Sequence, residues 1–161
     1  MGEHKRPKLR AIEDWLRSEY GGSASRTLDH VYSEEYRLRW KPKKSLEADY
    51  VKEINGKIVY VDVFGPNDDW RTILGKALCY SANADRAGGE YEVWLVTDFD
   101  DDAKTARLTG EKHKAQVEGW KMFYSEMKAL IVETMRPGIT GRVMILHAAT
   151  SGERKVLEPI G

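Results

Sequence analysis

Residues 46–64 read LEADYVKEINGKIVYVDVF and contain two strand-like runs separated by Asn55-Gly56. An Asn-Gly pair between two such runs is typical of a two-residue β-hairpin turn. The second run, residues 57–64, carries a valine at every second position. Because side chains alternate between the two faces of a strand, the valines predict a buried face and place Asp62 on the opposite face. Charged residues are uncommon inside strands, so Asp62 indicates a functional role.

The first run of the hairpin carries a second acid, Asp49. Pairing about the turn would bring Asp49 and Asp62 within reach of one cation. Mg²⁺ prefers oxygen ligands and usually takes one or two protein carboxylates, with water and substrate phosphate completing its shell. Such an ion polarises a phosphoryl oxygen and lowers the pKa of an attacking water. The hairpin therefore predicts a site for Mg²⁺ or Mn²⁺.

The flanking segments predict an α/β fold with a mixed central β-sheet flanked by helices. The expected elements are a helix over residues 8–20, strands over 27–40, 46–54 and 57–64, a helix over 70–84, a strand over 91–99, a helix over 111–135 and a strand over 141–148. Asp68 or Asp69 is available to cap the helix that begins at residue 70. The order is α-β-β-β-α-β, followed by a helix and a strand.

Composition narrows the class of protein. With 161 residues, 41% of them hydrophobic, the chain fits one folded domain over residues 1–161. A single cysteine, Cys79, excludes an intramolecular disulfide. No apolar run is long enough to span a membrane and the first residues lack a signal peptide's apolar region, so we expect a cytoplasmic protein with no membrane partner. Equal numbers of basic and acidic residues, 26 of each, argue against a strongly basic coat protein.

A helix with a glutamate, a hairpin with an aspartate, a second strand with an acid, and then a helix and a strand resemble the PD-(D/E)XK nuclease superfamily. The resemblance covers residues 9–99. It implies a restriction-endonuclease-like α-β-β-β-α-β core and divalent-metal-dependent hydrolysis of nucleic-acid phosphodiester bonds. By the same resemblance Glu13, Asp49 and Asp62 hold the metal, and the backbone carbonyl of Val63 is a further ligand.

The triplet that names the superfamily reads Asp62-Val63-Phe64 here, with phenylalanine in place of lysine. Phe64 can neither orient an attacking water nor offset charge in the transition state. Some members of the superfamily carry the lysine on the following helix, where this chain has Lys76. Lys76 and Tyr80 also resemble the Q-x-x-x-Y motif of RecB-like nucleases, with lysine in place of glutamine. We therefore expect catalysis by Asp49, Asp62 and Lys76.

The resemblance implies nucleic acid as the partner, and we expect DNA rather than RNA. A basic run beside the hairpin could follow a phosphate backbone, with Tyr80 as a further contact. Its members are Arg37, Arg39, Lys41, Lys43 and Lys44. A homodimer is compatible with the resemblance, because many nucleases of this type act as dimers.

Two alternatives remain open at this stage. The same fold could have lost its chemistry and serve to bind nucleic acid or a protein partner. The long C-terminal helix could instead offer Trp120, Phe123 and Met127 to a protein.

Three further features predict structural rather than catalytic roles. The acidic run over residues 98–102 follows a strand, where aspartates usually cap helices. For His113 and His147, which have no partner at a metal-binding spacing, we expect surface or packing roles.

Overall fold

The computed structural model describes residues 7–20, 23–24, 50–87, 90–134, 143–151 and 154–160. The strands are β1 (Ser23–Ala24), β2 (Tyr50–Ile54), β3 (Lys57–Phe64), β4 (Tyr91–Thr97), β5 (Val143–Ser151) and β6 (Arg154–Ile160). The helices are α1 (Pro7–Tyr20), α3 (Trp70–Ala87), the 3₁₀ helix η2 (Phe99–Asp101), α4 (Ala103–Arg107) and α5 (Gly110–Thr134). None of these described helices combines the length and apolar character that crossing a bilayer requires.

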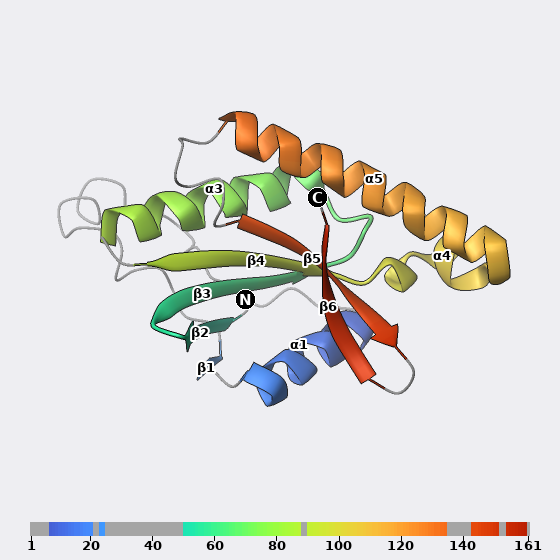
Figure 1. Ribbon diagram of the computed structural model, residues 1–161, viewed down its shortest axis with the longest axis horizontal. Coiled ribbons are helices and arrows are strands. Elements are labelled where there is room, and N and C mark those ends of the chain that lie inside the picture. The colour runs from blue at the N-terminus through green and yellow to red at the C-terminus, as the bar shows by residue number, and fades with distance from the viewer. Residues whose placement is uncertain are drawn as a thin grey trace.

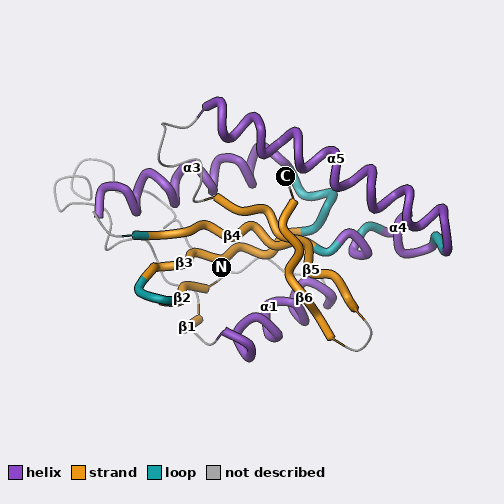
Figure 2. The backbone as a smooth tube through the Cα atoms, in the orientation of Figure 1, coloured by secondary structure: helices purple, strands orange, loops and turns teal. Residues whose placement is uncertain are grey.

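The strands form one mixed sheet in the order β1-β2-β3-β4-β5-β6. β3, β4 and β5 run parallel, whereas β1, β2 and β6 each pair antiparallel to a neighbour. Parallel neighbours need a crossover connection, and α3 and α5 provide the two crossovers. Both lie on one face of the sheet and α1 lies on the other (Figures 1 and 2). The prediction of an α/β fold with a mixed sheet flanked by helices is confirmed.

The hairpin between β2 and β3 follows the prediction. Asn55 and Gly56 have φ values of 51° and 80°, the left-handed conformations that a tight hairpin turn requires. The turn fixes the register, which runs from Ile54 opposite Lys57 to Tyr50 opposite Val61. The first strand of the hairpin is described from Tyr50 onward.

Alternating side chains of β3 enter two separate cores. The valines pack with α1 in a cluster whose members are Leu9, Ile12, Leu16, Val59, Val61, Val63, Val96, Leu146 and Ala148. On the other face, Tyr60 and Phe64 pack with α3 and α5. Both faces of β3 are therefore buried, and Asp62 belongs to the face of Tyr60 and Phe64.

The structure contains the short strand β1, which was not predicted, and it departs from the predicted elements again beyond residue 97. β4 ends at Thr97 because the Asp98 side chain accepts a hydrogen bond from the Asp100 N–H and turns the chain into η2. η2, α4 and β6 were not predicted. β6 (RKVLEPI) mixes charges and a proline, which sequence patterns assign to a loop although an edge strand tolerates them. The strand expected over residues 27–40 lies outside the described residues.

Candidate functional site

Asp62 is a buried carboxylate near the carboxyl end of β3, with only 4% of the residue exposed. α3 begins just beyond the end of β3 and passes back over this face of the sheet. It brings Lys76 toward the strand, so that Nζ lies 3.7 Å from Asp62 Oδ1. The structure thus brings together two of the predicted catalytic residues.

The two charged groups of this pair differ in their access to water. The Asp62 side chain is buried, whereas 32% of the Lys76 side chain is exposed. A buried carboxylate is unfavourable unless charges or hydrogen bonds compensate it, and the ammonium group supplies part of that compensation. At 3.7 Å the contact is an ion pair longer than a hydrogen bond. The pair therefore lies at the boundary between the core and the solvent.

Tyr80 follows Lys76 by one turn of α3, but its side chain is fully buried. Its ring stacks on Tyr60, with centroids 5.8 Å apart and planes inclined by 12°. The ring does not reach the surface, so Tyr80 is a packing residue and does not present a face to a nucleic acid. The nucleic-acid contact expected of Tyr80 does not fit this burial.

Phe64, the third residue of the triplet, is also a core residue. Its ring meets Tyr124 of α5 edge-on, with centroids 5.5 Å apart. The position where the resemblance would imply a lysine is therefore occupied by a ring that packs between the sheet and α5.

Glu13 lies on α1, which packs against the valine face of β3. Asp62 faces the other way, so the structure does not bring Glu13 and Asp62 together. The Glu13 carboxylate instead meets Arg17 one turn later, with Oε1 2.6 Å from Nη2. The metal role expected of Glu13 has no geometric support.

The remaining expectations for this site concern residues 25–49, which lie outside the described part of the chain. They are Asp49 and the basic residues Arg37, Arg39, Lys41, Lys43 and Lys44. These residues remain predictions.

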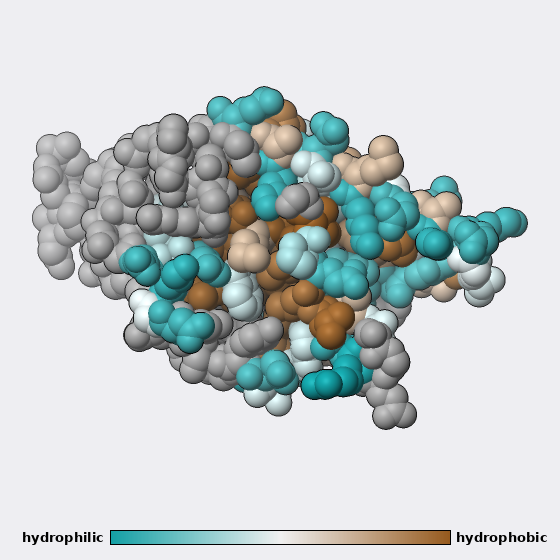
Figure 3. All heavy atoms as spheres, viewed as in Figure 1, coloured by the Kyte–Doolittle hydropathy of each residue, from teal (hydrophilic) through white to brown (hydrophobic). Residues whose placement is uncertain are grey.

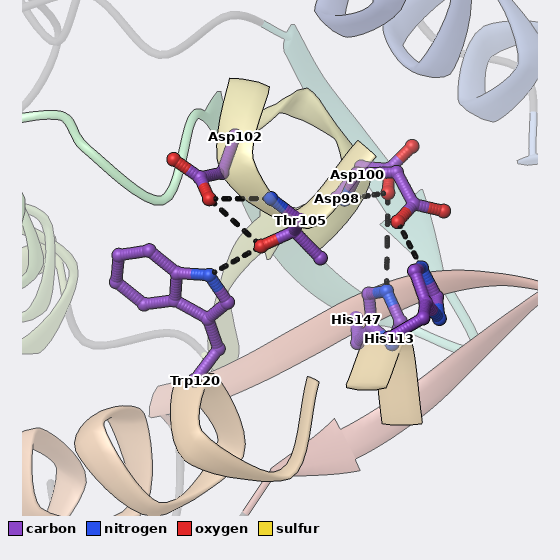
Figure 4. Close-up of polar contacts among 7 residues, drawn as sticks. All are labelled: Asp98, Asp100, Asp102, Thr105, His113, Trp120 and His147. Carbon is purple, nitrogen blue, oxygen red and sulfur yellow. Dashed lines mark hydrogen bonds and ion pairs between the residues drawn. The ribbon is translucent and has the colours of Figure 1, made fainter. Parts of the chain in front are cut away.

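A second polar cluster lies just beyond the carboxyl end of β4, beside the middle of β5 (Figure 4). Asp100 Oδ1 is 2.6 Å from Nε2 of His113 on α5. His147 Nε2 is 3.9 Å from Asp98 Oδ1, and its Nδ1 is 3.8 Å from Glu158 Oε2. The imidazole of His147 also stacks on the ring of Phe99, consistent with the expected packing role.

The predicted capping role of the acidic run is confirmed. Asp98 caps η2, and Asp102 caps α4 by accepting hydrogen bonds from the N–H and hydroxyl of Thr105, at 2.9 and 2.8 Å. Asp102 also accepts a 2.6 Å hydrogen bond from the Asn67 amide, and Trp120 Nε1 donates to the Thr105 hydroxyl. Burial alone would raise the pKa of Asp102, but the hydrogen bonds from Thr105 and Asn67 outweigh it and hold the pKa below its ordinary value.

The sequence did not predict the histidine–carboxylate contacts of this cluster because they join distant elements. One signal was available: an acidic run directly after a strand, and a histidine in a later strand. Thr97 at the end of β4 lies opposite His147 in the parallel register. This register brings the acidic run that follows Thr97 close to His147.

Within the described residues, no group of three or more His, Cys, Asp or Glu side chains is arranged to hold a metal ion. Among the residues that the structure describes, Asp62 is the one carboxylate placed at the first site, and Mg²⁺ can be held by as few as one or two. No protein-family profile, curated protein or solved structure matches the chain.

Proposed function

We propose that the protein is a divalent-metal-dependent nuclease with a restriction-endonuclease-like core, and that its active site is built around Asp62. The observation that carries the proposal is the contact between Asp62, buried in β3, and Lys76 of α3 at 3.7 Å. Such a carboxylate can hold a divalent metal ion, and an ammonium group beside it can stabilise negative charge on a phosphate, so the pair suits metal-assisted phosphodiester hydrolysis. We propose DNA rather than RNA as the substrate of the protein.

Each residue has a distinct role in this proposal. Asp62 offers oxygen ligands to Mg²⁺ or Mn²⁺, which when bound would polarise a phosphoryl oxygen and lower the pKa of water. The Lys76 ammonium stands beside that position and stabilises negative charge on the phosphate in the transition state. Its compact charge on a flexible stem can turn from Asp62 to a phosphate oxygen.

Asp49 belongs to the proposal on sequence grounds. The described β2–β3 ladder reaches Tyr50 opposite Val61. If pairing continues by one residue in the same register, position 49 stands opposite position 62. Directly opposed residues of antiparallel strands project from the same face, so Asp49 would share the Asp62 site and provide a second carboxylate.

The proposal is tested by cleavage of end-labelled single-stranded and duplex DNA, with RNA for comparison, in Mg²⁺ or Mn²⁺. We expect cleavage that EDTA abolishes and that falls about a hundredfold or more in Asp62→Asn and in Lys76→Met. Lys112→Met is the matched control, because it removes an exposed lysine from α5 and should leave the rate unchanged. Cleavage that survives Asp62→Asn would remove Asp62 from the active site.

A catalytically degenerate module that binds nucleic acid or a protein partner is the second candidate. The burial of Phe64 against Tyr124 favours this candidate, because the third residue of the triplet is a packing residue of the core and not a charged group. This candidate predicts no cleavage in either metal ion but binding to DNA that falls steeply with salt. Absence of both cleavage and DNA binding would leave only a protein partner.

The exposure pattern of α5 bears on such a partner. Met127 is buried and Trp120 donates a hydrogen bond to Thr105, whereas Phe123 is exposed. The three residues are therefore not presented together on one surface.

A further inference from the structure

β6 is the last strand in the order of the sheet, and no described strand pairs with its outer side. Such an edge presents backbone N–H and C=O groups to whatever lies beside it. In the view of Figure 1 the strand lies in front of β5, and Figure 3 shows hydrophobic atoms at the surface in this part of the molecule. Val156, in the middle of β6, is 37% exposed.

The side chains of β6 alternate, so that Arg154, Val156 and Glu158 share one face. Consider two copies of β6 paired antiparallel about a two-fold axis at Val156. Arg154 of each copy then stands directly opposite Glu158 of the other, and the two valines meet on the axis. The contact is self-complementary, as a two-fold interface must be.

The neighbouring registers are less favourable. An axis at Lys155 would oppose two lysines, and an axis at Leu157 would oppose Glu158 to Val156 and Arg154 to Ile160. Directly opposed unlike charges stabilise a strand pair, whereas like charges destabilise it. The register about Val156 is therefore selected by charge.

Arg154 and Glu158 are both exposed enough to form ion pairs with a second copy. Arg154 is exposed, and no ion pair joins it to another described side chain. The Glu158 side chain is 49% exposed, and its ion contacts with described residues, His147 at 3.8 Å and Lys121 at 3.9 Å, are both made by Oε2. The guanidinium of a second copy can thus reach Oε1.

Proline does not interrupt the pairing segment. Pro159 lies beyond Glu158, so each of the five residues from Arg154 to Glu158 keeps its N–H group.

We propose that β6 is a self-association edge, at which two copies of this chain join their sheets antiparallel about Val156 with reciprocal Arg154–Glu158 ion pairs. The proposal does not depend on the nuclease function. It concerns the edge of the sheet opposite β1, three strands away from β3.

Analytical ultracentrifugation across protein concentrations up to roughly millimolar tests the proposal. We expect a monomer–dimer equilibrium whose Kd rises at least about tenfold in Arg154→Glu and in Glu158→Arg, because each opposes like charges twice. The double variant that carries both reversals should regain the wild-type Kd. Lys155→Glu is the matched control, since it makes the same charge change opposite Leu157 and should leave the Kd nearly unchanged.

A chain that is monomeric at every concentration would overturn the proposal. A dimer whose Kd responds equally to Arg154→Glu and Lys155→Glu would overturn it as well. Val156→Cys gives an independent reading of the register, because two cysteines on the axis should form an intermolecular disulfide under mild oxidation. Dimers of this variant that do not cross-link would contradict an axis at Val156.

Discussion

The hydroxyl of Tyr124, in the middle of α5, donates a hydrogen bond of 2.8 Å to the carbonyl oxygen of Pro66, in the loop between β3 and α3. Tyr124 is fully buried, and its ring lies against Phe64 and Phe99. The bond fixes the loop that leads into α3, and α3 carries Lys76. A single buried hydroxyl therefore ties α5 to the segment that positions the proposed site.

Tyr124→Phe should destabilise the protein by about 1–3 kcal/mol, because it leaves the buried Pro66 carbonyl without its donor. Urea unfolding followed by circular dichroism measures the change. Tyr124→Leu should cost about 3–5 kcal/mol, because it also removes the ring from its aromatic neighbours. Equal stability of wild type and Tyr124→Phe would show that the hydrogen bond contributes nothing net.

Tyr124 should also make the free energy of unfolding decrease at alkaline pH. Burial, followed by the charge of Asp68, raises the pKa of Tyr124. In the unfolded chain the phenol ionises near its ordinary pKa of about 10. Above that pH only the unfolded state is stabilised by ionisation, so stability falls as pH rises. The fall should be shallower in Tyr124→Phe than in wild type when unfolding is measured between neutral and alkaline pH.

Asp102 should make the free energy of unfolding decrease at acidic pH, in the direction opposite to the effect of Tyr124. Its pKa is lowered in the folded state, so the carboxylate stabilises the fold above the ordinary pKa of about 3.9 and this stabilisation is lost as pH falls through the folded value. Asp102→Asn places an amide against the donors of Thr105 and Asn67 and should cost about 1–3 kcal/mol at neutral pH. The difference between wild type and variant should shrink below about pH 4.

Asp69→Asn is the matched control for this measurement. Asp69 also caps a helix, where its carboxylate accepts from Arg71, but the group is exposed. We expect a smaller change in stability than at Asp102. A loss at Asp69→Asn as large as that at Asp102→Asn would show that burial of the acceptor is unimportant.

The features that sequence alone predicted correctly are local. The Asn55-Gly56 turn, the valine face of β3 and the capping role of the acidic run over residues 98–102 follow from backbone preferences and from the period of two along a strand. What alternation could not show is that the face carrying Asp62 is buried too, because that depends on α3 and α5 arriving from later in the chain.

Contacts between distant elements were predicted less well. Lys76 was placed near Asp62 by a resemblance, and the observed ion pair agrees with that position, whereas its catalytic role remains a prediction. The sequence did not predict the partners of His113 and His147. Two of these partners, Asp100 and Glu158, lie on η2 and β6, and neither element was predicted.

The Asp62–Lys76 pair predicts an energetic coupling that can be measured apart from activity. Asp62→Asn, Lys76→Met and the double variant form a thermodynamic cycle. We expect a coupling free energy of about 1–2 kcal/mol, because one partner is buried and the other is partly solvated. The coupling should weaken when Mn²⁺ is added if the ion competes with the ammonium group for Asp62. A coupling near zero in the absence of metal would show that the two groups do not interact.

Two glycines of α5 predict opposite effects of the same substitution. Gly119 lies inside the helix, and a Cβ added there would meet nothing within 4 Å. Gly119→Ala should therefore stabilise the protein by about 0.5–1 kcal/mol, through the lower entropy of the unfolded chain. Gly110, the first residue of the helix, has a φ of 56° and equally open space.

At Gly110 the backbone rather than the surroundings decides the result. An alanine there is held in the left-handed region and should cost about 1–2 kcal/mol. Thermal unfolding of Gly119→Ala, Gly110→Ala and wild type under the same conditions compares the two positions. Since neither site has a steric neighbour, opposite shifts in Tm isolate the contribution of φ, and shifts of the same sign would contradict the left-handed conformation at Gly110.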